Sequence, residues 1–248
     1  MKLAKVLMLC AGIVSLSACK KDDSSSPTPA GPNNIPVIST ANGVLVAVKT
    51  NTWITFPVVG TVNQPVGIPV AVFYDAAGSS TLVDAGTVNC EDSLLSKQSN
   101  SSYLFTQSAY NSTGVDFNTG NSKWVVTGNT STGVPAVNFT TTIGFPVIDS
   151  ISNTGTVSTS ASLTLSSSGA IMNADSIIYT VSGTKGQLQK TTSGGIASVT
   201  FTAAEMGTVG KGSGSLTIAP YRFQPKTIDS KLYYFINETV STKVITLN

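Results

Sequence analysis

The chain has 248 residues, of which 14 are basic, 12 are acidic and none is histidine, so its net charge is +2. The lack of histidine excludes Ser-His-Asp and Cys-His nucleophile activation, and it excludes zinc, copper or iron sites that need imidazole ligands. The balanced charge and the single arginine, Arg222, argue against a nucleic-acid partner, because binding to phosphate backbones needs clustered basic side chains.

The first residues form a pattern typical of an export signal. Lys2 and Lys5 precede an apolar run from Val6 to Leu16, which has the length of a signal peptide and is too short to span a bilayer as a helix. Removal of both lysines would leave 12 basic and 12 acidic residues, because 14 minus 2 is 12, and hence a mature net charge of zero.

The end of this run resembles the lipobox of bacterial lipoproteins. Leu16-Ser17-Ala18-Cys19 places small residues before a cysteine. The resemblance implies cleavage between Ala18 and Cys19 and lipidation of Cys19, which would hold the protein on a membrane, since several acyl chains anchor where one does not. We therefore predict a signal peptide over residues 1–18; the alternative is an ordinary secretory signal with a chance cysteine.

A polar tether follows the predicted lipid anchor. Residues 19–35 are rich in Ser and Pro and lack side chains worth burying, so we expect them to be disordered. Lys21-Asp22-Asp23 resembles the surface-export signal of Bacteroidota lipoproteins, which implies the outer face of the outer membrane. The alternative is a plain spacer on a lipoprotein at the periplasmic face.

The body of the chain, from residue 36, predicts an all-β fold. Short runs rich in Val, Ile and Thr recur between Gly, Asn, Ser and Pro clusters, a pattern typical of sandwiches. The predicted strands are Val44–Val48, Trp53–Val59, Pro69–Asp75, Ser102–Thr106, Lys123–Thr127, Val137–Ile143, Val147–Ile151, Ser162–Ser166, Asp175–Ser182, Gln187–Lys190, Ala197–Thr202, Ser215–Pro220, Lys231–Ile236 and Val240–Leu247.

The length of the body predicts two tandem β-sandwich domains. Roughly 210 residues are too many for one sandwich of about 100 residues. Gly144-Phe145-Pro146 marks the expected boundary, so domain 1 covers 36–145 and domain 2 covers 146–248. The second domain resembles an immunoglobulin-like domain in architecture only, because it lacks a cysteine pair and a tryptophan, and the body resembles two-domain Bacteroidota lipoproteins by pattern alone.

One helical turn is expected between two strands of the second half. Thr202-Ala203-Ala204-Glu205 has the form of a capping box, and Gly207 follows as a helix end.

Exposed aromatic rings are candidates for glycan binding, because sugar-binding sandwiches stack their ligands on such rings. The candidates are Trp124, Tyr221 and Tyr234, and a core role is the alternative for each. Tyr221-Arg222-Phe223 reads as a strand end that runs into a loop. Tyr233-Tyr234-Phe235 must place rings on both faces of a strand. Trp53, Tyr103 and Tyr110 are further aromatic residues of this kind.

Three tripeptides resemble the O-glycosylation signal of Bacteroidota, an Asp, a hydroxyl residue and an apolar residue. They make Ser93, Ser150 and Ser176 candidates for modification. Cys90 is the one cysteine left after Cys10 and Cys19, so no disulfide is expected within the mature chain, and we expect Cys90 to be a small buried side chain.

Catalysis is not expected. The ten acidic residues of the body are scattered, and the adjacent Glu91 and Asp92 would diverge on a strand. No metal or cofactor motif is present. We predict a non-enzymatic surface lipoprotein that binds a protein or glycan ligand, with a carbohydrate-binding lipoprotein of a glycan-uptake system as the alternative. The oligomeric state stays open, because unpaired strand edges permit pairing between chains.

Overall fold

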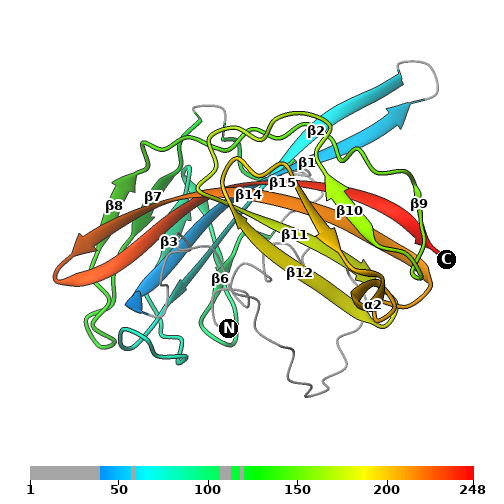
Figure 1. The fold of residues 1–248 in the computed structure, drawn as a ribbon. Coiled ribbons are helices and arrows are strands. Elements are labelled where there is room, and N and C mark those ends of the chain that lie inside the picture. Colours follow the sequence, from blue (N-terminus) through cyan, green and yellow to red (C-terminus); the bar gives the residue numbers. More distant parts are fainter. Residues whose placement is uncertain (1–39, 57–59, 107–112, 118–119) are drawn as a thin grey trace.

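The protein is built almost entirely of β-strands, which confirms the all-β prediction (Figure 1). The computed structural model describes residues 40–56, 60–106, 113–117 and 120–248, without the side chains of residues 51–64. The main sheet has nine strands in the order β12-β11-β14-β15-β1-β2-β6-β5, with β9 paired to β15. Its strands are β1 (Gly43–Phe56), β2 (Gly60–Phe73), β5 (Ser96–Lys97), β6 (Tyr103–Leu104), β9 (Thr156–Val157), β11 (Ser176–Gly183), β12 (Gly186–Ser193), β14 (Gly212–Ile228) and β15 (Lys231–Leu247).

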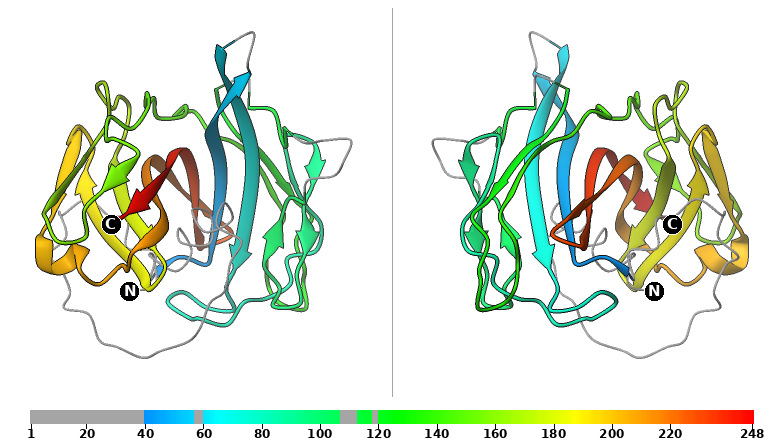
Figure 2. Two further views of the ribbon diagram at one scale, coloured as in Figure 1. Left: turned by 90° about the vertical axis from the view of Figure 1, so that its right-hand side faces the viewer. Right: turned by 90° about the vertical axis from the view of Figure 1, so that its left-hand side faces the viewer.

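Two smaller sheets flank the main sheet. One has four strands in the order β4-β3-β7-β8, and the other pairs β10 with β13. Figure 2 shows the main sheet bent between them, with β1 and β2 on one side of β14 and β15 and with β11 and β12 on the other. The remaining elements are β3 (Val88–Cys90), β4 (Ser93–Leu94), β7 (Lys123–Val126), β8 (Val137–Thr140), β10 (Leu163–Ser166), β13 (Ser198–Phe201) and the helix α2 (Ala203–Met206).

Both faces of the main sheet are apolar. In β1, Leu45 and Ala47 point to the face that the smaller sheets cover, which we call the outer face. The alternate residues Val44, Val46 and Val48 point to the opposite face, which we call the inner face. Successive side chains of a strand alternate between faces, so the near-continuous apolar run of β1 is that of a strand buried on both sides.

The outer face carries two separate hydrophobic cores. The first core lies between the main sheet and the four-stranded sheet, and Trp124 of β7 is its largest side chain. The second core lies between the other end of the main sheet and the β10–β13 pair, around Tyr179, Phe201 and Met206. Each fully buried large side chain contributes roughly 1.5–3 kcal/mol through loss of apolar surface from water.

The long hairpin of β14 and β15 joins the two cores. Asp229 and Ser230 adopt φ of 47° and 63°, as the two-residue turn of a tight hairpin requires. β15 then contributes Phe235 to the first core and Ile245 to the second, and it pairs in parallel with β1. Two tandem immunoglobulin-like domains are therefore not confirmed, because one sheet runs through both halves.

The predicted boundary at 144–146 lies where the chain crosses from one core to the other. Polar groups of β15 hold this crossing segment. The side chain of Asn237 accepts a hydrogen bond from Ser122 Oγ at 2.7 Å and donates to the carbonyl oxygen of Gly144 at 3.0 Å. Thr239 donates to the carbonyl oxygen of Pro146 at 2.7 Å. Residues 144–146, which we call the strap, thus cross the middle of the outer face.

Several predicted strands prove too short. Lys231–Ile236 and Val240–Leu247 are one strand, β15, and Ser215–Pro220 is the middle of β14. Tyr221-Arg222-Phe223 therefore lies inside a strand, and the predicted loop there is wrong. Trp53–Val59 is no separate strand, since β1 continues to Phe56 and residues 57–59 lie outside the described ranges.

The predicted helical turn is confirmed. The Thr202 side chain accepts a hydrogen bond from the Glu205 backbone N–H at 3.2 Å, and the Glu205 carboxylate accepts one from the Thr202 N–H at 2.7 Å. These reciprocal bonds complete the capping box. Within the described ranges, no helix is long and apolar enough to cross a membrane.

Candidate functional site

The inner face of the main sheet carries a buried apolar cluster of its own. All its buried members except Ala41 come from five neighbouring strands, and the pairing register places several opposite one another: Val44 with Val72, and Val46 with Val70 and Ile236. No residue of either smaller sheet belongs to this cluster among the side chains that the structure describes. Its buried members are Ala41, Val44, Val46, Val48, Ile68, Val70, Val72, Ile178, Ala219, Tyr221, Ile236 and Val240.

A row of three polar side chains crosses this apolar face. Ser176 of β11 pairs with Tyr221 of β14, and Tyr221 pairs with Glu238 of β15. Tyr221 belongs to the inner cluster, and Ser176 and Glu238 alternate with its members Ile178 and Ile236. The register therefore places all three side chains side by side on the inner face.

The three side chains are fully buried, and Glu238 lacks a hydrogen-bond partner. Each has a relative exposure of 0%. Within the described part of the chain, both carboxylate oxygens of Glu238 make no hydrogen bond, whereas the hydroxyls of Ser176 and Tyr221 face each other. Polar groups buried without a partner cost free energy, on the order of 1–3 kcal/mol each and more for a charged group, so native proteins rarely leave them unpaired. The unpaired Glu238 therefore makes this row the candidate site.

Burial controls the ionisation of the row. It raises the pKa of Glu238 from 4.5 to about 8, because the apolar surroundings penalise the carboxylate. Burial also raises the pKa of Tyr221 to about 12; the nearby Ser176 hydroxyl lowers it, while Glu238 and Asp175 raise it further. The row thus holds hydroxyl and carboxyl groups that can both donate and accept hydrogen bonds at neutral pH.

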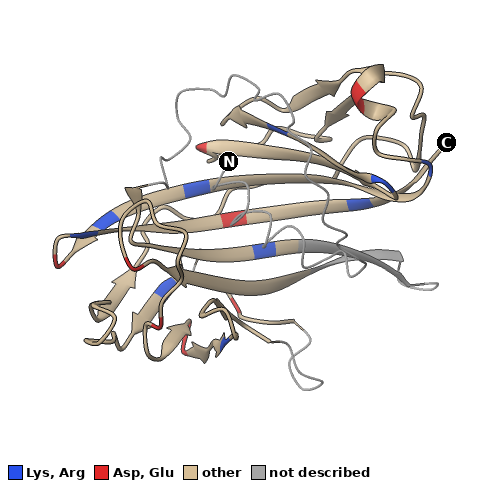
Figure 3. Cartoon of the chain, turned by 90° about the horizontal axis from the view of Figure 1, so that it is seen from below, with Lys and Arg blue, Asp and Glu red and all other residues tan. Residues whose placement is uncertain are grey.

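The cations of the main sheet point away from this row. Arg222 donates to the carbonyl oxygen of Ile143, and Lys243 donates to the carbonyl oxygens of Ile151 and Asn153, all at the outer face. Lys226 lies 6.0 Å from the ring centre of Phe139, and Lys190 lies 5.0 Å from that of Phe201. Figure 3 shows that acidic positions also lie mostly in loops and at strand ends. Glu238 is therefore the one charged residue on the inner face of the strands whose side chains are described.

Two half-buried rings extend the inner face toward the β14–β15 turn. Phe223 and Tyr234 have centroids 6.0 Å apart at an interplanar angle of 61°. This edge-to-face arrangement is a packing contact. It does not form the coplanar pair of exposed rings that a sugar would stack on.

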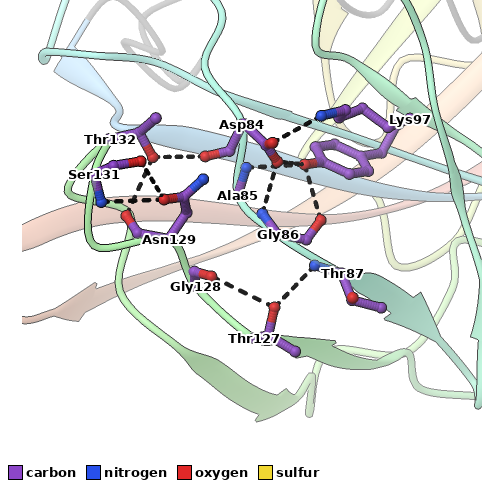
Figure 4. Close-up of polar contacts among 11 residues, drawn as sticks. Asp84, Ala85, Gly86, Thr87, Lys97, Thr127, Gly128, Asn129, Ser131 and Thr132 are labelled. Carbon is purple, nitrogen blue, oxygen red and sulfur yellow. Dashed lines mark hydrogen bonds and ion pairs between the residues drawn. The ribbon is translucent and has the colours of Figure 1, made fainter.

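A second polar cluster, drawn in Figure 4, has a structural explanation. Asp84 accepts hydrogen bonds from Lys97 at 2.7 Å and from the Tyr103 hydroxyl at 2.6 Å. These contacts lower the pKa of Asp84 to about 2, and the hydrogen bond from Lys97 has the largest effect. The Tyr103 hydroxyl also accepts from the Ala85 N–H, and its single proton is shared between Asp84 and the Gly86 carbonyl oxygen 3.0 Å away. Since Asp84, Lys97 and Tyr103 bond one another and the backbone of residues 85–86, the cluster fixes a loop.

The predicted glycan-binding residues do not share one surface. Trp124 has an exposure of 0% in the first core, where its Nε1–H donates to Ser122 Oγ at 3.2 Å. A ring in that position cannot stack on a sugar. Trp124 therefore has the core role that was the alternative to glycan binding. Tyr221 is buried within the polar row, and Tyr234 is half-buried at the inner face. Tyr103 is buried as well, whereas Tyr110 and the side chain of Trp53 lie outside the described part of the chain.

The candidate glycosylation sites differ in accessibility. Ser176 is fully buried, so its hydroxyl is out of reach in the folded protein. Ser93 and Ser150 are partly exposed, and Ser150 Oγ lies 3.0 Å from Ser168 Oγ. Ser93 and Ser150 therefore stay candidates.

The remaining predicted residues divide between the core and the undescribed N-terminus. Cys90 is a buried free cysteine of the first core, as predicted, and burial raises the pKa of its thiol well above the ordinary value. Ala18 and Cys19 lie outside the described residues, as do the signal peptide and the tether. No group of three or more Cys, Asp or Glu that could hold a metal ion occurs within the described ranges.

The sequence analysis missed Glu238 as a site residue. It lies in the polar triplet Asn237-Glu238-Thr239, which interrupts an apolar pattern and was interpreted as a gap between two strands. The assembled sheet supplies the missing signal: Asn237 and Thr239 bond the strap on the outer face, and alternation then turns Glu238 inward.

Comparison of the chain with protein-family models, with curated proteins and with solved structures finds no match.

Proposed function

We propose that this protein is a non-enzymatic lipoprotein, anchored by Cys19 to the outer membrane, that uses the inner face of its main sheet to bind a ligand at the cell surface. The observation that carries the binding role is Glu238, which is buried in an apolar face beside Tyr221 and Ser176 and has no hydrogen-bond partner among the described residues. The residues Leu16-Ser17-Ala18-Cys19 support the anchor, because they resemble a lipobox and lipid on Cys19 would hold the chain on a membrane, with the polar residues that follow as a tether.

Catalysis has little support in the described residues. The chain contains no histidine, and the carboxyl group with the strongest upward pKa shift, Glu238, faces hydroxyls and has no second carboxylate paired to it in the register. Two-carboxylate hydrolysis needs two such groups about 5–10 Å apart on either side of the scissile bond. The arrangement suits recognition better than bond cleavage.

We also propose that the two halves are immunoglobulin-like sandwiches fused through their shared sheet. The support is that each outer-face core lies between the main sheet and a smaller sheet of its own. Because β15 serves both cores, we expect residues 36–145 to fail to fold when expressed without β15.

The anchor is tested with Cys19→Ser. Cells expressing the unchanged protein should incorporate labelled palmitate into it and retain it in the outer-membrane fraction, and protease added outside should degrade it. The variant should incorporate no label and leave the membrane fraction. A mature chain that starts elsewhere than Cys19, or a variant that stays membrane-bound, contradicts the anchor, whereas protection from external protease indicates the periplasmic face.

Glycan binding is the second candidate, and Tyr234 supports it as a half-buried ring at the end of the inner face. Retardation of the protein in polysaccharide gels should be lost with Tyr234→Ala if sugars are the ligand. Equal mobility in gels with and without polysaccharide rules against this candidate.

A further inference from the structure

We propose that two copies of this chain associate through β12, edge to edge and antiparallel, about a two-fold axis at Gln189. β12 ends the main sheet, and among the described strands it pairs with β11 alone (Figure 1). Its other side is therefore a sheet edge. The inference goes beyond the proposed function and depends neither on the lipid anchor nor on a ligand at the inner face.

The hydrogen bonds of the β11–β12 hairpin determine which backbone groups lie on that edge. The Gly194 N–H donates to the Asp175 carbonyl oxygen at 2.9 Å, so these residues form a hydrogen-bonded pair. Because such pairs alternate with non-bonded pairs along an antiparallel ladder, Leu188, Lys190 and Thr192 bond β11. The N–H and C=O groups that point to the open side are those of residues 187, 189, 191 and 193. Within the described ranges, no other strand bonds them.

The two ends of the main sheet differ in how they are protected. At the far end, β5 has two residues, and the side chain of its Lys97 is 48% exposed. Short strands and charged side chains keep sheet edges from pairing with other chains. β12 has eight residues and no proline, and its one charged side chain is already bound. Lys190 Nζ donates to the Thr200 carbonyl oxygen at 2.8 Å and to the Glu205 carboxylate at 2.9 Å. β12 thus keeps an edge without either protection.

The sequence of β12 is complementary to itself, which favours a second copy as the partner. In an antiparallel pair centred on Gln189, Gln187 lies opposite the partner's Thr191, and Leu188 lies opposite the partner's Lys190. No two charged residues of β12 then face each other. A pair centred on Lys190 would place two lysines opposite each other, which is unfavourable, and one centred on Leu188 would shorten the paired stretch. The same edge on both copies gives a closed, two-fold dimer.

The mature chain, residues 19–248 with Cys19→Ser, is the form to test, because it retains every described element and carries no lipid. Sedimentation equilibrium at rising protein concentration should show a reversible monomer–dimer equilibrium with no larger species. A monomer at every concentration would overturn the proposal, and so would growth beyond the dimer, because a two-fold pair leaves no β12 edge free.

Charge at the axis tests the site of contact. Gln189→Lys and Gln189→Glu should each weaken dimerisation by about tenfold or more, because like charges then meet across the axis. An equimolar mixture of the two variants should dimerise again, since opposite charges meet, and this recovery also shows that both variants are folded. Gln98→Lys, which follows β5 at the far end of the sheet, is the matched control and should change nothing. Dimerisation that is insensitive to both charges, or a mixture that does not recover, contradicts the proposal.

Cross-linking tests the register. Gln189→Cys places two thiols opposite each other with Cα atoms about 5.5 Å apart, a separation that suits a disulfide. Oxidation with copper phenanthroline should therefore give a covalent dimer. Gln187→Cys places its two thiols several residues apart along the strands, too far for a disulfide, and should stay monomeric in denaturing gels. Cys90 is buried and should not compete. Equal cross-linking of the two variants would contradict the pairing about Gln189.

Discussion

The two faces of the main sheet are equally apolar but differ in what covers them. On the outer face, Ile177 and Tyr179 meet side chains of a second layer, and the polar groups between the two cores bond the strap. On the inner face, Ile178 and Ile236 belong to a cluster drawn from the main sheet and its edges, and Glu238 has no hydrogen-bond partner among the described residues. The polar groups of the outer face are thus paired, whereas the inner face has the composition of a core and an unpaired buried carboxyl group.

The largest expected effect compares the two faces with two neighbouring residues of one type. Ile177→Ala removes a side chain packed into the second core and should lower the free energy of unfolding by about 2–5 kcal/mol. Ile178→Ala, on the inner face of the same strand, removes a side chain that is also buried and should cost a similar amount. Urea unfolding of both variants at pH 7 measures the difference. A clearly smaller loss for Ile178→Ala would mean that the inner face is packed less tightly than the second core.

The second prediction concerns Glu238 and runs against the usual behaviour of carboxyl groups. Its pKa is about 8 in the folded protein and 4.5 ordinarily, so the folded state binds the proton more tightly. Its contribution to stability is therefore fully present below pH 4.5 and is lost as the pH rises through 8. At pH 7 the loss is about 3 kcal/mol, since each pH unit above 4.5 removes roughly 1.4 kcal/mol.

Glu238→Gln cannot ionise and should remove this loss. The stability difference between the variant and the unchanged protein should grow in favour of the variant by about 3 kcal/mol from pH 4.5 to pH 7, measured by denaturant unfolding without ligand. A difference that stays constant over this range would show that the carboxyl group is solvated or paired in the mature protein.

The contrast between the faces also explains what the sequence could predict. The apolar run Val44–Val48, the alternation around Phe201 and the capping box at Thr202 are local signals, and each indicated the correct element. The parallel pairing of β1 with β15 joins residues 190 positions apart, as Gly43 with Tyr233, and no local pattern carries it. The Asn237-Glu238-Thr239 triplet was misinterpreted because its three side chains serve two faces, which is visible only once the sheet is assembled.

The third prediction addresses the strap on the outer face. Asn237 is buried and bonds Ser122, Thr141 and Gly144. Asn237→Ala leaves those groups without their partner and should cost about 2 kcal/mol, from typical net values of 0.5–1.5 kcal/mol per hydrogen bond. Urea unfolding at pH 7 measures the loss, and an unchanged free energy of unfolding would show that these bonds do not stabilise the strap.

The smallest expected effect comes from Asp84, the outer-face counterpart of Glu238. Lys97 and Tyr103 hold the pKa of Asp84 at about 2, below the ordinary 3.8, so the folded state binds the proton less tightly. Its contribution is present above about pH 3.8 and is lost as the pH falls toward 2. Because the Asp84 and Lys97 side chains are 34% and 48% exposed, solvent screening limits the contribution to under about 1 kcal/mol. In Asp84→Asn, the free energy of unfolding should therefore fall less between pH 3.8 and pH 2, by under about 1 kcal/mol. Its change between pH 4.5 and pH 7 should be the same as in the unchanged protein. An effect of Asp84→Asn on the neutral limb would mean that the two carboxyl groups are coupled across the sheet, which their separate sets of contacts argue against.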